Sequence, residues 1–295
     1  LMSLVKFASA VVLASVALSS VPALAAKKSP KPAAIVAPAL DPATAQLLDA
    51  AIAGQHRSAE EKARDVYRHP REALAFYGLN STMTVIEVSP GAGWWTELLA
   101  PLLRDSGKLQ VALNTNLNGG GRRGLGDTLV RYAAAPKVYD KVELINYAPS
   151  LGTRLGVDGG ADMVLVFRHM HGLIGNNLAP QALKLYFDAL KPGGVLAIEQ
   201  HRWPDAQPYP ERKEGWEGAN SGYIKEADVI ALATAAGFKL VGKSEVNANP
   251  KDTRDHPRGV WNLPPVLRDG AVDKDKYLAI GESDRMTLKF VKPTA

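Results

Sequence analysis

Two short polar stretches of this sequence contain histidines next to other side chains that can exchange protons. Arg168–His171 directly follows one apolar run, and Glu199–His201 directly follows another. The ordinary pKa of a histidine is about 6.5, so its side chain can accept or donate a proton at neutral pH. We therefore take His169 and His171 as the candidate catalytic bases. The alternative is that both are hydrogen-bonded loop histidines with a structural role.

The same two stretches bear on metal binding. His169 and His171 could share a metal ion with Glu199 and His201 through nitrogen and oxygen ligands. Their spacing does not match a pair of ligands on one helix face, which a metal-binding helix would need. The chain has no cysteine, which excludes thiolate ligands and cysteine nucleophiles. We predict no metal site.

A third candidate site is the stretch Glu87–Thr96, with the sequence EVSPGAGWWT. A β-branched apolar run ends in Glu87, and the chain then passes through proline and two glycines into a helical pattern. Glycines permit backbone conformations closed to other residues and let a ligand approach the main chain. The N–H groups at the start of the helix point to the same place. This pattern is typical of a nucleotide-binding α/β domain, although an ordinary strand-to-helix turn has the same composition.

Trp94 and Trp95 stand where the helix of this stretch would begin. One of the two rings could stack on an adenine or face a cationic ligand, a contact worth about 0.5–2 kcal/mol. The alternative is that one ring belongs to the core and the other covers the surface.

The elements that would position these side chains alternate between strands and helices. Strands are expected at 83–88, 108–113, 142–145, 162–167, 195–198, 238–244 and 286–291, and helices at 94–103, 127–135, 180–190 and 225–235. We predict a Rossmann-like, doubly wound α/β fold with a seven-stranded, mostly parallel sheet and a reversed last strand. Ligands of such sheets bind beyond the carboxyl ends of the strands. The glycine-rich segment 118–126 is expected to be a mobile loop.

Residues 41–80 are expected to form accessory helices before the first strand. Asp41 caps a helix over 42–53, Ser58 begins a capping box for a helix over 58–67, and Gly78 ends a third helix that starts at Pro70. We assign residues 81–295 to the main domain, with an insertion at 245–281. This insertion is either a lid over a ligand or a solvated structural segment. Trp261 could fold it onto the body, and Glu282–Arg285 could anchor it by charge pairing.

The N-terminal 26 residues have the pattern of a secretory signal peptide. Lys6 precedes a short apolar core, and a small-residue site predicts cleavage near Ala25. Residues 27–40 read as a linker rich in proline, alanine and lysine. We expect a periplasmic or secreted protein without stable membrane insertion after cleavage. The net charge of +5 includes no dense Lys/Arg block, so nucleic acid is not an expected partner.

Four motifs in this order resemble those of the class I S-adenosylmethionine-dependent methyltransferases. Glu87–Gly93 is similar to the acidic and glycine-rich first motif of that family, and Lys191–Leu196 to the turn before its fifth strand. Ala235–Phe238 resembles its small-small-Gly-Phe link, and Met286–Phe290 its reversed last strand. More narrowly, Phe167–His171 and the signal peptide resemble a group of exported bacterial proteins described as predicted methyltransferases.

The resemblance implies S-adenosylmethionine as cofactor and a small-molecule methyl acceptor, with His169 or His171 facing that acceptor. The residues that it assigns to the cofactor are Glu87, Ser89, Pro90, Gly91, Ala92, Gly93, Trp94, Trp95, Thr96, Asn114, Asn146 and Arg168. Two positions depart from the family pattern. Ser89 replaces the first glycine of the loop, and Asn114 stands where an acidic residue usually binds the ribose. An asparagine can bind a hydroxyl group, but without the strength of a charge-assisted hydrogen bond.

Two other functions are compatible with such a fold. A non-catalytic ligand-binding protein could retain the fold after losing the cofactor. A nicotinamide-dependent oxidoreductase would need a third glycine where Thr96 stands, and an acidic residue at the end of the second strand. The sequence lacks both, which argues against the oxidoreductase.

Overall fold

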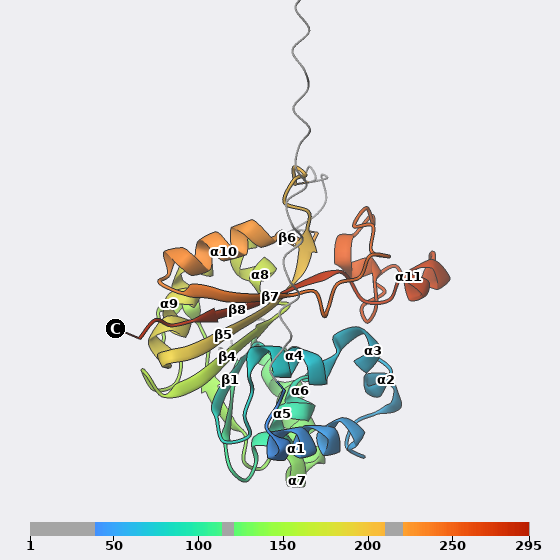
Figure 1. The fold of residues 1–295 in the computed structure, drawn as a ribbon. Helices are drawn as coiled ribbons and strands as arrows, with labels where there is room; N and C mark the ends of the chain where they lie inside the picture. The colour runs from blue at the N-terminus through green and yellow to red at the C-terminus, as the bar shows by residue number, and fades with distance from the viewer. Residues whose placement is uncertain (1–38, 114–120, 210–220, 295) are drawn as a thin grey trace, which may run out of the picture. The chain divides into compact units, whose positions relative to one another are not determined.

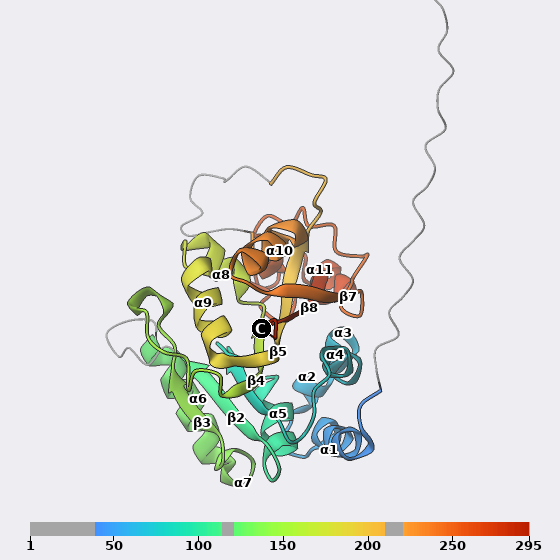
Figure 2. The ribbon, with the colours of Figure 1, turned by 60° about the vertical axis from the view of Figure 1, so that its left-hand side comes forward.

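The computed structural model describes residues 39–113, 121–209 and 221–294 (Figures 1 and 2). All described helices and strands lie in one unit, Ile35–Ala295. The predicted signal peptide, most of the predicted linker and Asn114 lie outside the described residues. Within the described part of the chain, no helix has the length and apolar character needed to cross a membrane.

A mixed sheet forms the centre of the unit. Its strands are β1 (Thr84–Val88), β2 (Lys108–Leu113), β3 (Glu143–Asn146), β4 (Ala161–Phe167), β5 (Leu190–Trp203), β7 (Lys239–Ser244) and β8 (Arg285–Val291). They lie in the order β3-β2-β1-β4-β5-β8-β7, and the short β6 (Ile224–Lys225) pairs with β5. Strand β8 is antiparallel to β5 and β7, whereas the other neighbours are parallel. The predicted fold class, including the reversed last strand, is confirmed.

Helices cover both faces of the sheet, as Figure 1 shows. One face is covered by α8 (Met170–Gly175), α9 (Ala179–Ala189) and α10 (Glu226–Ala235), and the other by α1 (Pro42–Ala53), α4 (Pro70–Tyr77), α5 (Thr96–Leu103), α6 (Gly121–Ala134) and α7 (Pro136–Tyr139). Strand β1 shows the alternation that this arrangement requires. Ile86 and Val88 belong to the core under α8–α10, and Val85 to the core under α1, α4 and α5.

The predicted caps of the accessory helices are present. Asp41 accepts a hydrogen bond from the amide of Thr44, Ser58 and Glu61 form the capping box, and Gly78 ends α4 with a φ of 78°. The predicted helix over 58–67 is nevertheless two short helices, α2 (Ala59–Lys62) and α3 (Asp65–Arg68). The carbonyl of Glu61 accepts from the amide of Arg64 at 3.1 Å and from the indole of Trp94 at 2.9 Å, and not from the amide of Asp65 that would continue the first helix.

The glycine-rich segment is the first correction. Helix α6 begins at Gly121, so the part of the expected loop from 121 to 126 is helical, and 118–120 lie outside the described residues. A glycine inside a helix costs about 1 kcal/mol relative to alanine. The second half of α6 is firmly anchored, because Arg131 forms an ion pair with Glu97 at 2.5 Å and Tyr132 stacks on Tyr139. These tertiary contacts override the local preference.

Strand β5 is the second correction. It is longer than expected and includes the predicted Lys191–Gly194 turn, around which the register with β4 shifts. At its other end it pairs with β8 from Val195 to His201. Glu199–His201 therefore lies within a strand and does not follow one. The cause is the antiparallel neighbour, whose position in the sheet no local pattern in 195–203 indicates.

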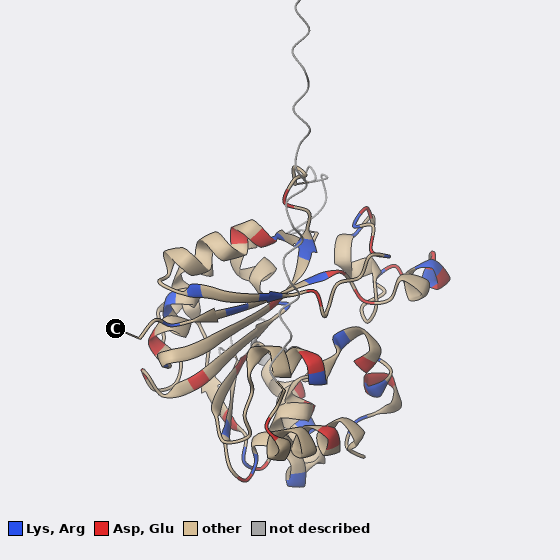
Figure 3. Ribbon diagram, viewed as in Figure 1, with Lys and Arg blue, Asp and Glu red and all other residues tan. Residues whose placement is uncertain are grey.

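The insertion between β7 and β8 contains the short helical turn η2 (Gly259–Asn262) and helix α11 (Lys274–Ile280). Basic and acidic residues lie side by side on α11 (Figure 3). No helix was expected here, because the segment is dominated by polar and turn-forming residues. The arrangement of charges on α11 is that of a solvated surface helix.

Candidate functional site

The loop after β1 has a strained backbone. The amide of Ser89 donates to the carbonyl of Ala112 at 2.9 Å and so continues the pairing with β2. Ser89 then adopts a φ of 49°, followed by 59° at Gly91 and 80° at Gly93. A non-glycine residue in the left-handed region is unfavourable, and such residues concentrate at functional sites. The structure thus reproduces the sharp turn that the Ser-Pro-Gly-Ala-Gly sequence predicts.

The tip of this loop is open to a ligand. Gly91 and Ala92 are exposed, and a Cβ added to Gly91 would meet no atom within 4 Å. The amide of Gly93 is used by the carbonyl of Pro90 at 3.0 Å, but the amides of Gly91 and Ala92 find no acceptor among the described residues. Two N–H groups at the carboxyl end of a central strand can therefore donate to a bound molecule.

Glu87 lies beneath the loop and is 4% exposed. One of its carboxylate oxygens accepts a hydrogen bond from the hydroxyl of Thr96 at 2.7 Å. Burial raises the pKa of Glu87 to about 7, against the lowering effect of Thr96 and of the Arg131 charge. Glu87 and Thr96, both expected at the cofactor, are thus bonded to each other below the loop.

Both tryptophans of the loop are buried. The ring of Trp94 lies under the guanidinium groups of Arg57 and Arg68, at 5.2 and 4.7 Å from the ring centroid. The ring of Trp95 packs against Phe167 with 4.8 Å between centroids. These contacts anchor the loop to the accessory helices and to β4. Stacking of either ring on an adenine remains a prediction.

His169 joins the loop to the end of β4. Its Nε2 atom lies 3.4 Å from the hydroxyl oxygen of Ser89, and its ring meets the edge of Tyr147 with 5.9 Å between centroids. Burial, and secondarily the charge of His171, lowers the pKa of His169 to about 4. The imidazole is therefore neutral at pH 7 and is able to accept a proton.

His171 lies in the first turn of α8 and has different neighbours. The side-chain oxygen of Gln200 is 3.3 Å from its Nδ1, and the ring of Trp261 from the insertion is 5.5 Å away. Burial lowers the pKa of His171 to about 4, opposed by the Gln200 contact and assisted by the charge of Arg168. Trp261 therefore does fold the insertion onto the body, as predicted.

The remaining cofactor candidates lie at the ends of β2 and β3. Leu113 pairs in register with Asn146, which is exposed at the end of β3. Asn114 lies outside the described residues, directly after Leu113. The roles of Asn114 and Asn146 remain predictions.

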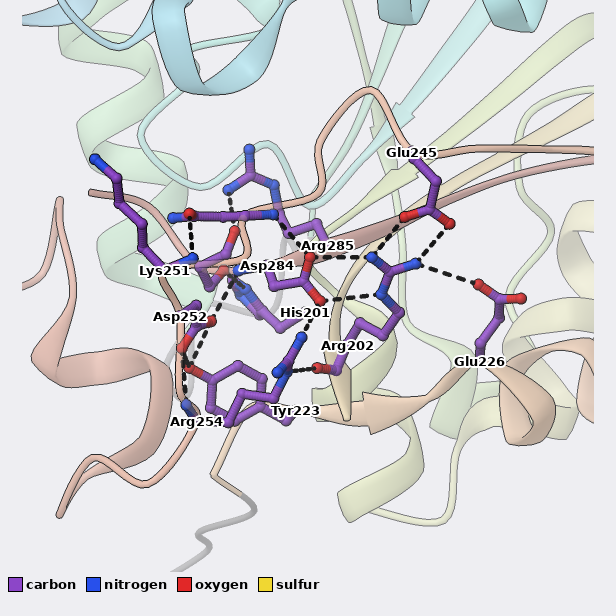
Figure 4. A network of polar contacts seen from close by, with 12 residues as sticks. His201, Arg202, Tyr223, Glu226, Glu245, Lys251, Asp252, Arg254, Asp284 and Arg285 are labelled. Atoms are coloured by element: carbon purple, nitrogen blue, oxygen red, sulfur yellow. Dashed lines mark hydrogen bonds and ion pairs between the residues drawn. The ribbon is translucent and has the colours of Figure 1, made fainter. Parts of the chain in front are cut away.

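The segment before β8 holds the insertion by charge pairing, as expected from its sequence. Asp284 accepts from Arg202 at 3.0 Å and from Arg254 at 2.5 Å, and its amide donates to Asp252 (Figure 4). Asp252 also accepts from the hydroxyl of Tyr223 at 2.8 Å. This network ties the insertion to β5, β6 and β8.

Sequence reasoning expected charge pairing at Glu282–Arg285 but missed that Glu282 lies in a buried cluster of arginines. Arg64, Arg68, Arg285 and Arg168 have side-chain nitrogens 2.8, 3.0, 3.2 and 3.7 Å from its carboxylate. Glu282 is 2% exposed. Despite its burial, these charges hold the pKa of Glu282 at about 2. Arg64 directly precedes α3, which ends at Arg68, and Arg168 directly follows β4. Only Arg285 is close to Glu282 in the sequence, so local spacing could not have indicated the cluster. Among the described residues, no group of three or more histidines or carboxylates could hold a metal ion.

Searches of protein-family models and of curated proteins found no match to this chain. Solved structures do match. The 4+2 cyclase SpnF has a TM-score of 0.54 at 13% identity, over 86% of this chain and 94% of SpnF. A SAM-dependent methyltransferase from Aquifex aeolicus has a TM-score of 0.49 at 16% identity, over 78% of this chain and 93% of that enzyme. The glycopeptide N-methyltransferase MtfA, complexed with S-adenosyl-L-homocysteine, has a TM-score of 0.49 at 15% identity, over 77% and 90%.

The chain has a Rossmann-like fold, which it shares with SpnF. At 13% identity the likeness to SpnF establishes the fold and leaves the reaction open. This fold places the loop after β1 and the end of β4 at neighbouring strands. It is here that the candidate residues Ser89 and His169 meet.

Proposed function

We propose that this protein is an exported S-adenosylmethionine-dependent methyltransferase that acts on a small molecule. The observation that carries the proposal is the strained Ser89–Gly93 loop, with open amides at its tip and His169 facing its base. The loop follows β1, from which the strand order β3-β2-β1-β4-β5 runs in both directions. Such reversals are where open α/β sheets bind their ligands.

The residues around the loop fit the cofactor. The amides of Gly91 and Ala92 can donate to it, and the open space beside Gly91 leaves room for it. Glu87, whose pKa is about 7, would supply negative charge toward a cationic ligand once ionised. When bound, S-adenosylmethionine supplies an electrophilic methyl group.

The acceptor side follows from His169. Because its imidazole is neutral at pH 7 and its Nε2 faces the loop, it can remove a proton from an acceptor held there. Positioning of two reactants can contribute about 7–11 kcal/mol, so a weak base is sufficient. Export is supported by the sequence pattern of residues 1–26 alone.

The test is titration calorimetry with S-adenosylmethionine and S-adenosylhomocysteine. We expect both to bind, and Gly91→Val to weaken binding at least about tenfold, because the added side chain fills the open space beside the loop. Gly159→Val is the matched control. Gly159 has a similar φ of 63°, and an added Cβ there also meets nothing within 4 Å. It precedes β4, so it lies at the amino ends of the strands, opposite to the β1 loop. Absence of binding at millimolar concentration would instead support the non-catalytic ligand-binding protein.

A further inference from the structure

The cluster around Glu282 contains more positive charge than its carboxylates balance. Arg285 is fully paired, because its Nε lies 2.7 Å from Glu199 and its Nη1 lies 3.2 Å from Glu282. The carboxylate of Glu282 must then also compensate the charges of Arg64, Arg68 and Arg168. Four guanidinium groups thus share two carboxylates. Buried charges are normally paired, since removing them from water is costly.

Arg64 lies at the rim, where 19% of its side chain is exposed and water can solvate it. Arg68 is 4% exposed, and its Nε donates to both oxygens of Glu282 at 3.0–3.1 Å. Its two Nη atoms have no hydrogen-bond acceptor among the described residues. Burial lowers the pKa of Arg68 to about 9 even though Glu282 opposes this. Arg68 is therefore a buried cation with spare donors.

Arg168 is the least compensated member. Its Nη1 is 3.7 Å from Glu282, which is beyond hydrogen-bonding distance. Its Nε donates to Nε2 of His201 at 3.4 Å. His201 cannot offset the charge, because burial keeps its pKa well below the ordinary value and the ring is neutral. Among the described residues, nothing accepts a hydrogen bond from either Nη atom of Arg168.

The position of Arg168 relates this charge to the candidate active site. Arg168 follows the last residue of β4 and directly precedes His169. It adopts a φ of 56°, so the turn that brings His169 to Ser89 is itself strained at Arg168. One fifth of the side chain is exposed, so a ligand can reach it. The charge of Arg168 acts on His171, the second candidate base, whose ring lies 5.7 Å from that of His201, the partner of Arg168. A molecule held by Arg168 would thus lie near His171.

We propose that Arg168 and Arg68 form a subsite for an oxyanion, a carboxylate or phosphate group carried by the methyl acceptor. Guanidinium groups bind both kinds of oxyanion through paired N–H donors. That the oxyanion belongs to a methyl acceptor rests on the proposed function, but the anion site itself does not depend on methyl transfer. If both hold, the methyl acceptor is a small organic anion.

The experiment measures the thermal unfolding midpoint of the full chain in sodium phosphate and in sodium acetate, against sodium chloride at equal ionic strength. We expect at least one oxyanion to raise the midpoint by about 3 °C or more, as a ligand that binds only the folded state must. Arg168→Gln should abolish this rise. Arg104→Gln is the matched control, because it removes the same charge from a pair with Asp140 on the exposed surface of the α5–α7 region and should retain the rise. The oxyanion with the larger effect identifies the group.

A second measurement keeps the test independent of folding defects. In chloride, Arg168→Gln should leave the midpoint unchanged or raise it, because it removes an unbalanced cation. Arg285→Gln should lower the midpoint by about 5 °C or more, because it leaves the buried Glu199 without its partner. Equal oxyanion effects in the wild type and Arg168→Gln, or equal losses for the two variants in chloride, would overturn the subsite.

Calorimetry with S-adenosylmethionine separates this inference from the proposed function. Cofactor binding without an oxyanion effect rejects the subsite and leaves the methyltransferase proposal intact. An oxyanion effect that requires Arg168, without cofactor binding, supports the anion site and rejects the methyltransferase proposal.

Discussion

At the scale of single residues, the candidate site depends on polar side chains that the fold holds in unusual protonation states. His169 is neutral well below pH 7, whereas the pKa of Glu87 lies near neutrality. Both shifts have burial as their largest cause. Side chains with strongly shifted pKa values in the same region are typical of functional sites. Each shift has a measurable consequence.

Glu87→Gln should change how stability depends on pH. The pKa of Glu87 is about 7 in the folded protein, against 4.5 ordinarily. As pH rises from 4.5 to 7, the unfolded chain releases this proton first, so the wild type loses up to about 3 kcal/mol. The glutamine side chain of the variant does not titrate. In urea unfolding experiments, the free energy of unfolding of the variant should therefore rise relative to that of the wild type as the pH rises over this range. Glu143→Gln should show the opposite trend, because contacts with Lys108 and Gln110 lower the pKa of Glu143. Parallel curves for Glu87→Gln and the wild type would refute the raised pKa.

His169→Ala should abolish methyl transfer but preserve cofactor affinity, since its Nε2 faces the Ser89 hydroxyl from the end of β4. With a pKa of about 4, His169 should produce an acid limb near pH 4, whereas a change near pH 7 would belong to Glu87. Turnover assays and calorimetry on the same preparation would measure both. Full activity of His169→Ala would remove this residue from the mechanism, and His171→Ala would then test the second candidate.

At the scale of elements, the insertion between β7 and β8 is held mainly by buried ion pairs. Asp284 is 1% exposed and contacts Arg202 and Arg254. Trp261 from the same insertion touches His171. An element fixed in this way by a few polar contacts can be loosened without disturbing the sheet.

Asp284→Asn should therefore destabilise the insertion selectively. The variant leaves Arg254 without its carboxylate, whereas Arg202 keeps Glu245 and Glu226, so we expect a loss of about 1–3 kcal/mol. Hydrogen exchange should accelerate over residues 245–284 and remain unchanged in β1 and β4. Asp140→Asn breaks the exposed pair with Arg104 and should cost less than about 1 kcal/mol. Uniform acceleration throughout the sheet would show that the insertion does not open on its own.

The same scale shows what could be predicted from sequence. Strand β2 has its predicted bounds, and Gly78 ends α4 as predicted, because apolar runs and caps are local signals. The predicted end of β5 and the predicted start of α6 were wrong, because each depends on a partner distant in the chain. At the candidate site, sequence motifs predicted the loop after β1 and His169. Glu282 and its arginines did not, because more than 200 residues separate it from Arg64 and Arg68.

At the scale of the whole molecule, the proposed activity and the proposed export make opposite demands. The Rossmann-like fold is established, whereas the methyltransferase activity, the cofactor and the destination of the chain are proposals. An exported methyltransferase needs its cofactor outside the cytoplasm, so the export proposal bears directly on the proposed function. The N-terminal sequence must therefore be tested as well as the candidate site.

We expect the chain to be found in the periplasm when it is expressed in a bacterium with two membranes, with a mature N-terminus near Ala26. The physical reason is the basic Lys6 followed by a short apolar core and a small-residue site, which a signal peptidase cleaves. Fractionation and intact mass would measure location and processing. Ala25→Gln should block cleavage, because the site accepts only small side chains there, while Ala33→Gln in the linker should not. An unprocessed chain in the cytoplasm would reject export and place the enzyme where its cofactor is made, and the acceptor would then be sought among cytoplasmic anions.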